Sequence, residues 1–268
     1  MYRKREVLHA VEGWVVAPGR DDNLTVTQRA ALDVLTDHTA QQFPLGTKLE
    51  DLIGNRTFRY CQLGAVAGVA GALYQSAVPV AHHVNIPPAA AVPIGDTSLT
   101  VTAGATASVL NAYAGGYMVI LGGTGAGYTY RVKSSSVVAA GGGACVVALY
   151  DPIKVALATA DSKIAIVANP CKGLVIHPSV PTARVAGLLP FPVAASRFGW
   201  CQTRGPAGVL GNGTLVIGLN CVPGATTDGT VDVQPLNSVD AGGQEYVMGV
   251  VMDVQATTKY STVFLKLE

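Results

Sequence analysis

The glycine-rich run 122–127 is the first segment whose residues could do chemistry, because such runs can cradle phosphate groups. Its sequence, Gly-Gly-Thr-Gly-Ala-Gly, lacks both the GxGxxG spacing and the following Lys-Ser/Thr pair of nucleotide-binding loops. It also leads into the alternating segment 128–133, which predicts a strand where a phosphate-binding loop would need a helix. The run therefore predicts a hairpin loop.

Histidines and cysteines are the next candidates, as metal ligands. His82 and His83 are adjacent, but no HExxH or HxH pattern surrounds them, and His177 is the only other histidine after residue 60. The cysteines are Cys61, Cys145, Cys171, Cys201 and Cys221. Their odd number and the lack of CxxC spacing argue against a disulfide framework or a zinc site. We expect buried free thiols and neither a metal nor another cofactor.

The sequence contains no motif for hydrolytic catalysis either. A GxSxG nucleophile motif does not occur, and most of the few carboxylates after residue 60 lie at turn-like positions, where Asp favours local hydrogen bonds. We therefore expect no catalytic residues and a protein that is not an enzyme.

Charge is scarce and unevenly spread. Charged residues make up 13% of the 268 residues, against about 25% in typical proteins, and 16 of the 35 charges lie within residues 1–60. The net charge of +1 provides no field for attracting nucleic acid. The uncharged stretches are interrupted by Gly and Pro too often for a membrane-spanning helix, and no apolar signal segment follows the basic N-terminus. A charge-poor surface favours packing against neighbouring proteins.

Elements that could position these residues are almost all strands. Alternating or short apolar segments separated by glycine-rich turns predict strands throughout residues 57–267. The expected strands are 57–62, 98–102, 117–121, 128–133, 145–150, 163–167, 174–177, 199–203, 215–219, 230–234, 246–254 and 262–267. Before them, a capping-box spacing from Thr25 to Gln28 predicts one helix over 25–38, and a short strand is expected at 14–16.

The predicted fold class is all-β, with a barrel or sandwich body, an inserted β-subdomain and an extended N-terminal arm that contains one short helix. We expect the arm to span 1–56. The body would combine 57–95 with 169–268, and the inserted subdomain would span 96–168, between a proline-rich stretch and the Asn-Pro turn at 169–170.

A set of short motifs in the sequence resembles motifs of a known class of proteins. The motifs are Pro44–Lys48, Thr57–Tyr60, Gly115–Tyr117, Gly127–Tyr130, Leu149–Pro152, Asn169–Pro170 with Gly173–Val175, Phe198–Ala207 and Met248–Val251. Together they resemble structural virion proteins of tailed bacteriophages that decorate, or cement, the capsid. The run Gly-Trp-x-Gln-Thr-x-Gly-Pro within 199–206 is the most distinctive piece.

The resemblance implies a non-enzymatic head protein that binds the lattice of the major capsid protein on the outer surface of the virion, after synthesis in the host cytoplasm. It also implies self-association as a homotrimer, with neither nucleic acid nor membrane as a partner. The N-terminal arm lies outside the resembling region. We infer from its charge and position that it contacts the shell through Tyr2, Arg3, Lys4, Arg5 and Trp14.

Two alternatives remain open at this point. A phage tail or fibre component would show the same charge-poor sequence with many short β-strands. A carbohydrate-binding β-module would need exposed aromatic side chains, and Trp200 is the aromatic residue to examine for that role, although its position within an expected strand favours the core.

Overall fold

The computed structural model describes residues 14–16, 32–51, 53–234, 246–255 and 260–268, with side-chain environments described from residue 32 onward. These residues form strands β1–β16 and one short 3-10 helix, η1 (Ala81–His83). The prediction of an all-β fold is confirmed. The chain divides into two compact units: unit 1 comprises residues 1–77 and 171–268, and unit 2 comprises residues 78–170.

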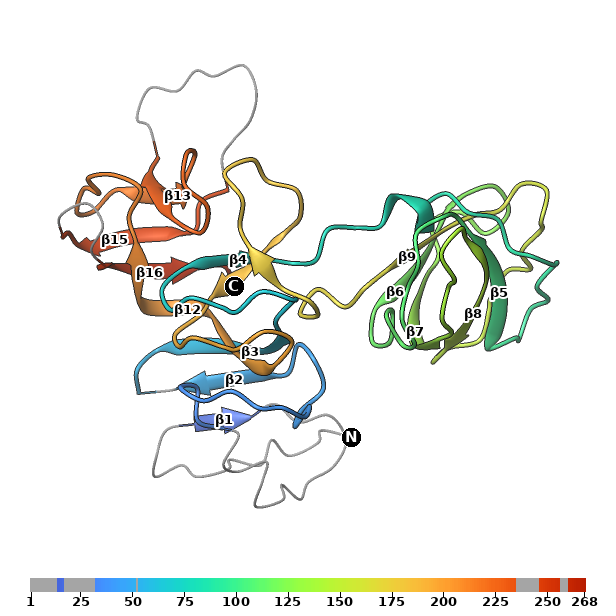
Figure 1. Ribbon diagram of the computed structural model, residues 1–268, viewed down its shortest axis with the longest axis horizontal. Helices are drawn as coiled ribbons and strands as arrows, with labels where there is room; N and C mark the ends of the chain where they lie inside the picture. Colours follow the sequence, from blue (N-terminus) through green and yellow to red (C-terminus); the bar gives the residue numbers. More distant parts are fainter. Residues whose placement is uncertain (1–13, 17–31, 52, 235–245, 256–259) are drawn as a thin grey trace. The chain divides into compact units, whose positions relative to one another are not determined.

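Unit 1 is built on an antiparallel sheet with the strand order β1-β2-β3-β12-β16-β15-β13-β14 (Figure 1). In that order the strands are Trp14–Val16, Lys48–Asp51, Arg56–Gln62, Phe198–Leu210, Tyr260–Lys266, Gly249–Asp253, Asn220–Pro223 and Val231–Val233. The 13-residue β12 pairs with β3 along its first half and with β16 along its second. It therefore joins the two halves of the sheet.

Three shorter strands complete unit 1. β4 (Leu73–Gln75) pairs with both β10 (Val175–Ile176) and β11 (Val185–Leu188), and β11 joins β12 through Leu188 and Gln202. Separate apolar clusters fill the space beside the sheet, one of them aromatic, with Phe43, Tyr60 and Trp200 in edge or tilted contact.

Unit 2 is a five-stranded antiparallel sheet with the order β5-β8-β7-β6-β9 (Figure 1). These strands are Ser98–Ala103, Gly143–Leu149, Thr129–Ser135, Tyr117–Gly122 and Lys163–Val167. Residues 86–89 bond to both edges of the sheet. Ile86 exchanges two backbone hydrogen bonds with Ile164 of β9 (2.8 and 2.9 Å), and Ala89 donates to Thr100 of β5 (2.8 Å). The segment thereby closes the sheet into a small barrel around an apolar interior.

The predicted arm differs from the structure. Of the helix expected over 25–38, residues 25–31 lie outside the described residues, and 32–38 form turns that end in a bridge between His38 and Phe198. The carboxylate of Asp37 accepts hydrogen bonds from the Ala194 amide (2.8 Å) and Arg197 (3.0 Å), so tertiary contacts fix this backbone. Residues 48–51 form β2 and belong to the sheet of unit 1, not to an arm.

The unit boundary also differs from the prediction. Residues 78–95 were expected with the body, but they lie in unit 2. Their backbone bridges, from Ile86 to Ile164, Pro88 to Val101 and Val92 to Leu157, explain this placement. The strand expected over 215–219 is likewise wrong. Leu219 donates to the Val216 carbonyl (3.2 Å) in a turn that contains Gly218 at a φ of +82°.

Candidate functional site

The glycine-rich run closes the β6–β7 hairpin, as its sequence predicts. Ile120 donates to the Tyr128 carbonyl (2.9 Å), and Gly127 donates to the Ile120 carbonyl (2.8 Å). The amide and hydroxyl of Thr124 both donate to the carboxylate of Asp161 (3.0 and 2.8 Å). This carboxylate fixes the loop, and an anion directly beside it would be repelled.

The histidines serve local structure. His83 is 1% exposed, and its ring bonds to the Tyr113 hydroxyl through Nδ1 and to the Thr106 carbonyl through Nε2 (2.9 Å). His82 bonds to the Thr106 hydroxyl (2.7 Å), and His177 lies in the other unit. Among the described residues, no three His, Cys, Asp or Glu side chains are grouped so as to hold a metal ion.

All five cysteines are free thiols, and four of them are buried. Burial raises the pKa of Cys171 to about 12 and that of Cys221 to about 11. The pKa of Cys201 is also raised, by its contact with Cys61 and by burial. Cys171, Cys201 and Cys221 therefore stay protonated near neutral pH and are poor nucleophiles.

The motif Gly-Trp-x-Gln-Thr-x-Gly-Pro lies on β12 and has structural roles. Trp200 is 1% exposed within the aromatic cluster, with its ring centroid 5.0 Å from that of Tyr60. The amide of Gln202 donates to the carbonyls of Arg204 and Pro206 (2.9 Å each), across the point where the pairing with β3 shifts register. Gly205 follows at a φ of +87°. The motif therefore builds the bend in β12, and Trp200 cannot serve as an exposed sugar platform.

The candidate shell-contact residues fall at the edge of the described chain. Tyr2, Arg3, Lys4 and Arg5 lie outside the described residues. The backbone of Trp14 belongs to β1, where it pairs with Asp51 of β2. The short strand expected at 14–16 is thus confirmed, and it attaches the N-terminal segment to one edge of the unit 1 sheet.

A pocket of about 540 Å³ opens in unit 1 between the segment after β10, the start of β11 and the end of β13. Its lining residues are His177, Ser179, Pro181, Ala183, Arg184, Val185, Pro223, Ala225 and Tyr246. Burial lowers the pKa of His177, which leaves Arg184 as the cation of the lining at neutral pH. The pocket suits an apolar group that carries an acidic substituent. Sequence reasoning missed it because its walls come from three separated stretches without any motif.

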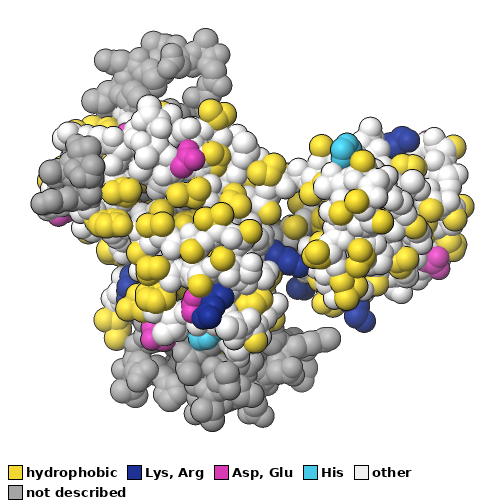
Figure 2. Space-filling model, viewed as in Figure 1, with side chains coloured by type: hydrophobic (Ala, Val, Ile, Leu, Met, Phe, Trp, Pro, Cys, Tyr) yellow, Lys and Arg dark blue, Asp and Glu magenta, His cyan; other side chains and the backbone are white. Residues whose placement is uncertain are grey.

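The described surface is poor in charge and carries many apolar side chains. Figure 2 shows hydrophobic and uncharged side chains over most of the described face in view, with only scattered Lys, Arg, Asp and Glu. Large apolar side chains with more than 60% exposure include Ile53, Val66 and Ile217 in unit 1 and Val109 and Leu110 in unit 2. Such a surface suits association with other proteins.

Comparisons with known proteins return no match: no family model, no curated protein and no solved structure resembles the chain significantly. In the part of the chain that the structure describes, no helix is both long and apolar enough to cross a membrane.

Proposed function

We propose that the chain is a non-enzymatic virion structural protein that decorates and stabilises a bacteriophage capsid by binding the lattice of the major capsid protein. The observation that carries the proposal is the exposed apolar, charge-poor surface of the two β-units. The described histidines and cysteines, which were the candidates for chemistry, have structural roles and form no metal-binding group. The motif resemblance supplies the identity of the partner. In this proposal the protein acts on the outer surface of the virion as a homotrimer, without nucleic acid, membrane or cofactor.

Two compact β-units suit this task because each one buries an apolar core of its own. The apolar side chains that remain outside are then free to be covered by neighbours in a lattice. Many weak, repeated contacts of this kind add up when subunits occupy every equivalent position on a shell.

The N-terminal segment is proposed as the shell-binding element. β1 anchors its end to β2, so residues 1–13 precede a strand whose position is fixed by the sheet. Tyr2, Arg3, Lys4 and Arg5 would contribute one ring and three cations to a contact that is otherwise poor in charge. An acidic patch on the shell would be the complementary surface.

Quantitative mass spectrometry of purified source particles, separated into heads and tails, tests the proposal. We expect a copy number comparable to that of the main shell protein, in the head fraction. A few copies in the tail fraction would instead assign the chain to a tail or fibre. Its absence from particles would refute the virion assignment.

Truncation tests the N-terminal segment. Removing residues 1–13 leaves β1 intact and should weaken binding to purified shells, with the far-ultraviolet circular dichroism of the β-fold unchanged. Removing residues 1–24 also deletes β1 and should weaken binding at least as much. Unchanged shell binding by both truncations would exclude the segment from the interface.

A further inference from the structure

Three side chains form a row on the outer face of the unit 2 barrel. Tyr117 of β6 lies directly opposite Arg131 of β7, so the two side chains share one face of the sheet. The guanidinium of Arg131 lies over the ring of Tyr150, 4.9 Å from its centroid, and the Tyr150 amide donates to the Arg131 carbonyl (3.0 Å). Tyr117 is 41% exposed and Tyr150 is 54% exposed. Two accessible rings thus flank one stacked cation.

The spacing of this row is set by the sheet. Neighbouring strands lie about 4.8 Å apart, so two side chains separated by one intervening strand lie roughly 10 Å apart. Two rings at that separation can each contact a different ring of one oligosaccharide chain. The apolar C–H faces of a sugar pack on aromatic rings, while its hydroxyl groups bond to polar neighbours.

Positive charge accompanies the rings. Lys133 lies two residues beyond Arg131 on β7 and is exposed on the same face. The four ion pairs among the described residues all lie in unit 1, so neither cation is neutralised by an ion pair within unit 2, whose residues are all described. The complementary ligand therefore carries negative charge as well as stacking faces.

Total charge separates an acidic glycan from a nucleic acid. The charged residues of unit 2 are Arg131, Lys133, Lys154, Lys163, Asp96, Asp151 and Asp161, a net charge of +1. A nucleic-acid backbone requires a basic groove that follows many phosphates, which two adjacent cations do not provide. A sugar chain with one carboxylate per residue or per branch needs only one or two cations beside its stacking rings.

We propose that the outer face of unit 2 binds acidic glycans, with Tyr117 and Tyr150 stacking on sugar rings and Arg131 and Lys133 pairing with carboxylates. The proposed site does not depend on shell binding. It would give a surface-displayed protein a second, adhesive role, and a test of glycan binding does not test the decoration function.

Isothermal titration of the full-length chain with oligogalacturonate and with sialylated oligosaccharides tests the proposal. Maltohexaose serves as the neutral comparison and oligothymidylate as the nucleic-acid comparison. We expect binding to at least one acidic glycan that weakens with added salt. Tyr117→Ala and Tyr150→Ala should each lower the association constant roughly tenfold. Arg131→Gln should lower it to a similar degree and also reduce its salt dependence.

Matched variants control for general effects. Tyr246→Ala removes a tyrosine of similar exposure (51%) from the pocket of unit 1. Lys163→Gln removes a cation on β9. Lys163 lies opposite Gly122 in the strand register, at the other end of β6 from Tyr117. Both variants should bind like the wild type, and circular dichroism should show all five variants folded.

Three results would overturn the proposal. Failure of every acidic glycan to bind would refute it, as would equal affinity for maltohexaose. Binding of oligothymidylate in preference to glycans would make the face a nucleic-acid site. Loss of glycan binding in Tyr246→Ala, with Tyr117→Ala unaffected, would move the ligand to the unit 1 pocket.

Discussion

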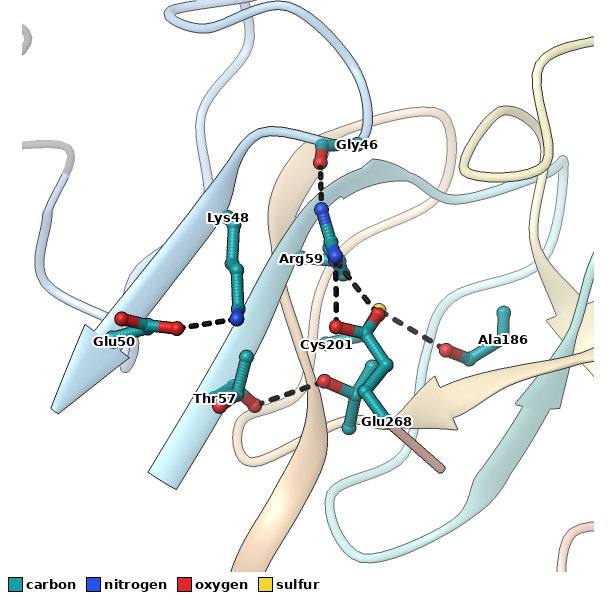
Figure 3. Close-up of polar contacts among 9 residues, drawn as sticks. Gly46, Lys48, Glu50, Thr57, Arg59, Ala186, Cys201 and Glu268 are labelled. Atoms are coloured by element: carbon teal, nitrogen blue, oxygen red, sulfur yellow. Dashed lines mark hydrogen bonds and ion pairs between the residues drawn. The ribbon is translucent and has the colours of Figure 1, made fainter. Parts of the chain in front are cut away.

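Arg59 and Glu268 lie 209 positions apart in the sequence, yet their side chains form two parallel hydrogen bonds of 2.7 and 2.8 Å (Figure 3). The third donor of the guanidinium, Nη1, bonds to the Gly46 carbonyl (2.9 Å). Donating these hydrogen bonds to the Glu268 carboxylate raises the pKa of Arg59. Residue 268 is thereby tied to β3 and to the turn that precedes β2.

Replacing Glu268 with Gln should lower the free energy of unfolding by about 1 kcal/mol, because a bidentate pair between partly buried side chains loses its charge. Urea denaturation, followed by tryptophan fluorescence in a Trp14→Phe background that leaves Trp200 as the single tryptophan, measures the loss. Glu50→Gln is the matched control: Glu50 pairs with Lys48 on the same short strand, where both side chains are one-third exposed. An equal loss in both variants would show that the Arg59 pair has no special contribution.

Gly205→Ala should destabilise unit 1 by about 2 kcal/mol or more. Gly205 has a φ of +87°, and a Cβ atom there would lie 2.2 Å from the Asn55 carbonyl oxygen, part of a backbone that cannot move aside cheaply. Thermal unfolding monitored by circular dichroism provides the measurement. Gly208→Ala is the control on the same strand, because its Cβ would meet nothing within 4 Å. Equal melting temperatures for the two variants would contradict the strain argument.

Strands with one buried face were predictable from the sequence. The alternation over 128–133 falls within one or two residues of β7 (Thr129–Ser135), because a two-residue period directly reports a half-buried strand. The short apolar segment 163–167 matches β9 at both ends, although residues 164–166 are all buried and do not alternate. The apolar run 215–219 failed as a strand because Gly218 and a local hydrogen bond close a turn there.

Features set by long-range contacts were not predictable. The expected helix over 25–38 failed in its described part, where Asp37 is held by residues about 160 positions away. Similarly, the row of Tyr117, Arg131 and Tyr150 depends on the register between three strands, which no local pattern encodes. Trp200, the aromatic residue that the sequence singled out, is buried instead.

Residues 78–170 should fold as an isolated fragment. Its strands pair only with one another, and its apolar cluster lies entirely between residues 86 and 166. We expect dispersed amide signals and a cooperative thermal transition for this fragment by NMR and calorimetry. If the isolated fragment is unfolded, unit 2 depends on unit 1 for its folding.

The complementary deletion should also fold. Gln75 of β4 pairs with Val175 of β10, so the two ends left by removing unit 2 lie beside each other in the same sheet. A short Gly-Ser linker between residues 77 and 171 can therefore join them without strain. Both tryptophans, Trp14 and Trp200, lie in unit 1, and we expect the tryptophan fluorescence of this deletion variant to match that of the full chain. A shifted spectrum would mean that unit 1 does not close on its own.

The stability of unit 2 should decrease as the pH falls below about 6.5. Burial lowers the pKa of His83 from its ordinary value of 6.5; the hydrogen bond to Thr106 opposes this shift, and repulsion from His82 adds a smaller lowering. The unfolded chain therefore takes up the proton at a higher pH than the folded one, so this stability is complete above pH 6.5 and is lost as the pH falls through that value toward the lowered pKa. Hydrogen exchange of the Ile164 amide, which bonds to Ile86 in the barrel, reports on unit 2 separately from His177 in unit 1. His83→Gln keeps a hydrogen-bonding side chain without a titrating group and should flatten the pH dependence of the protection. An unchanged slope in this variant would assign the pH sensitivity to another group.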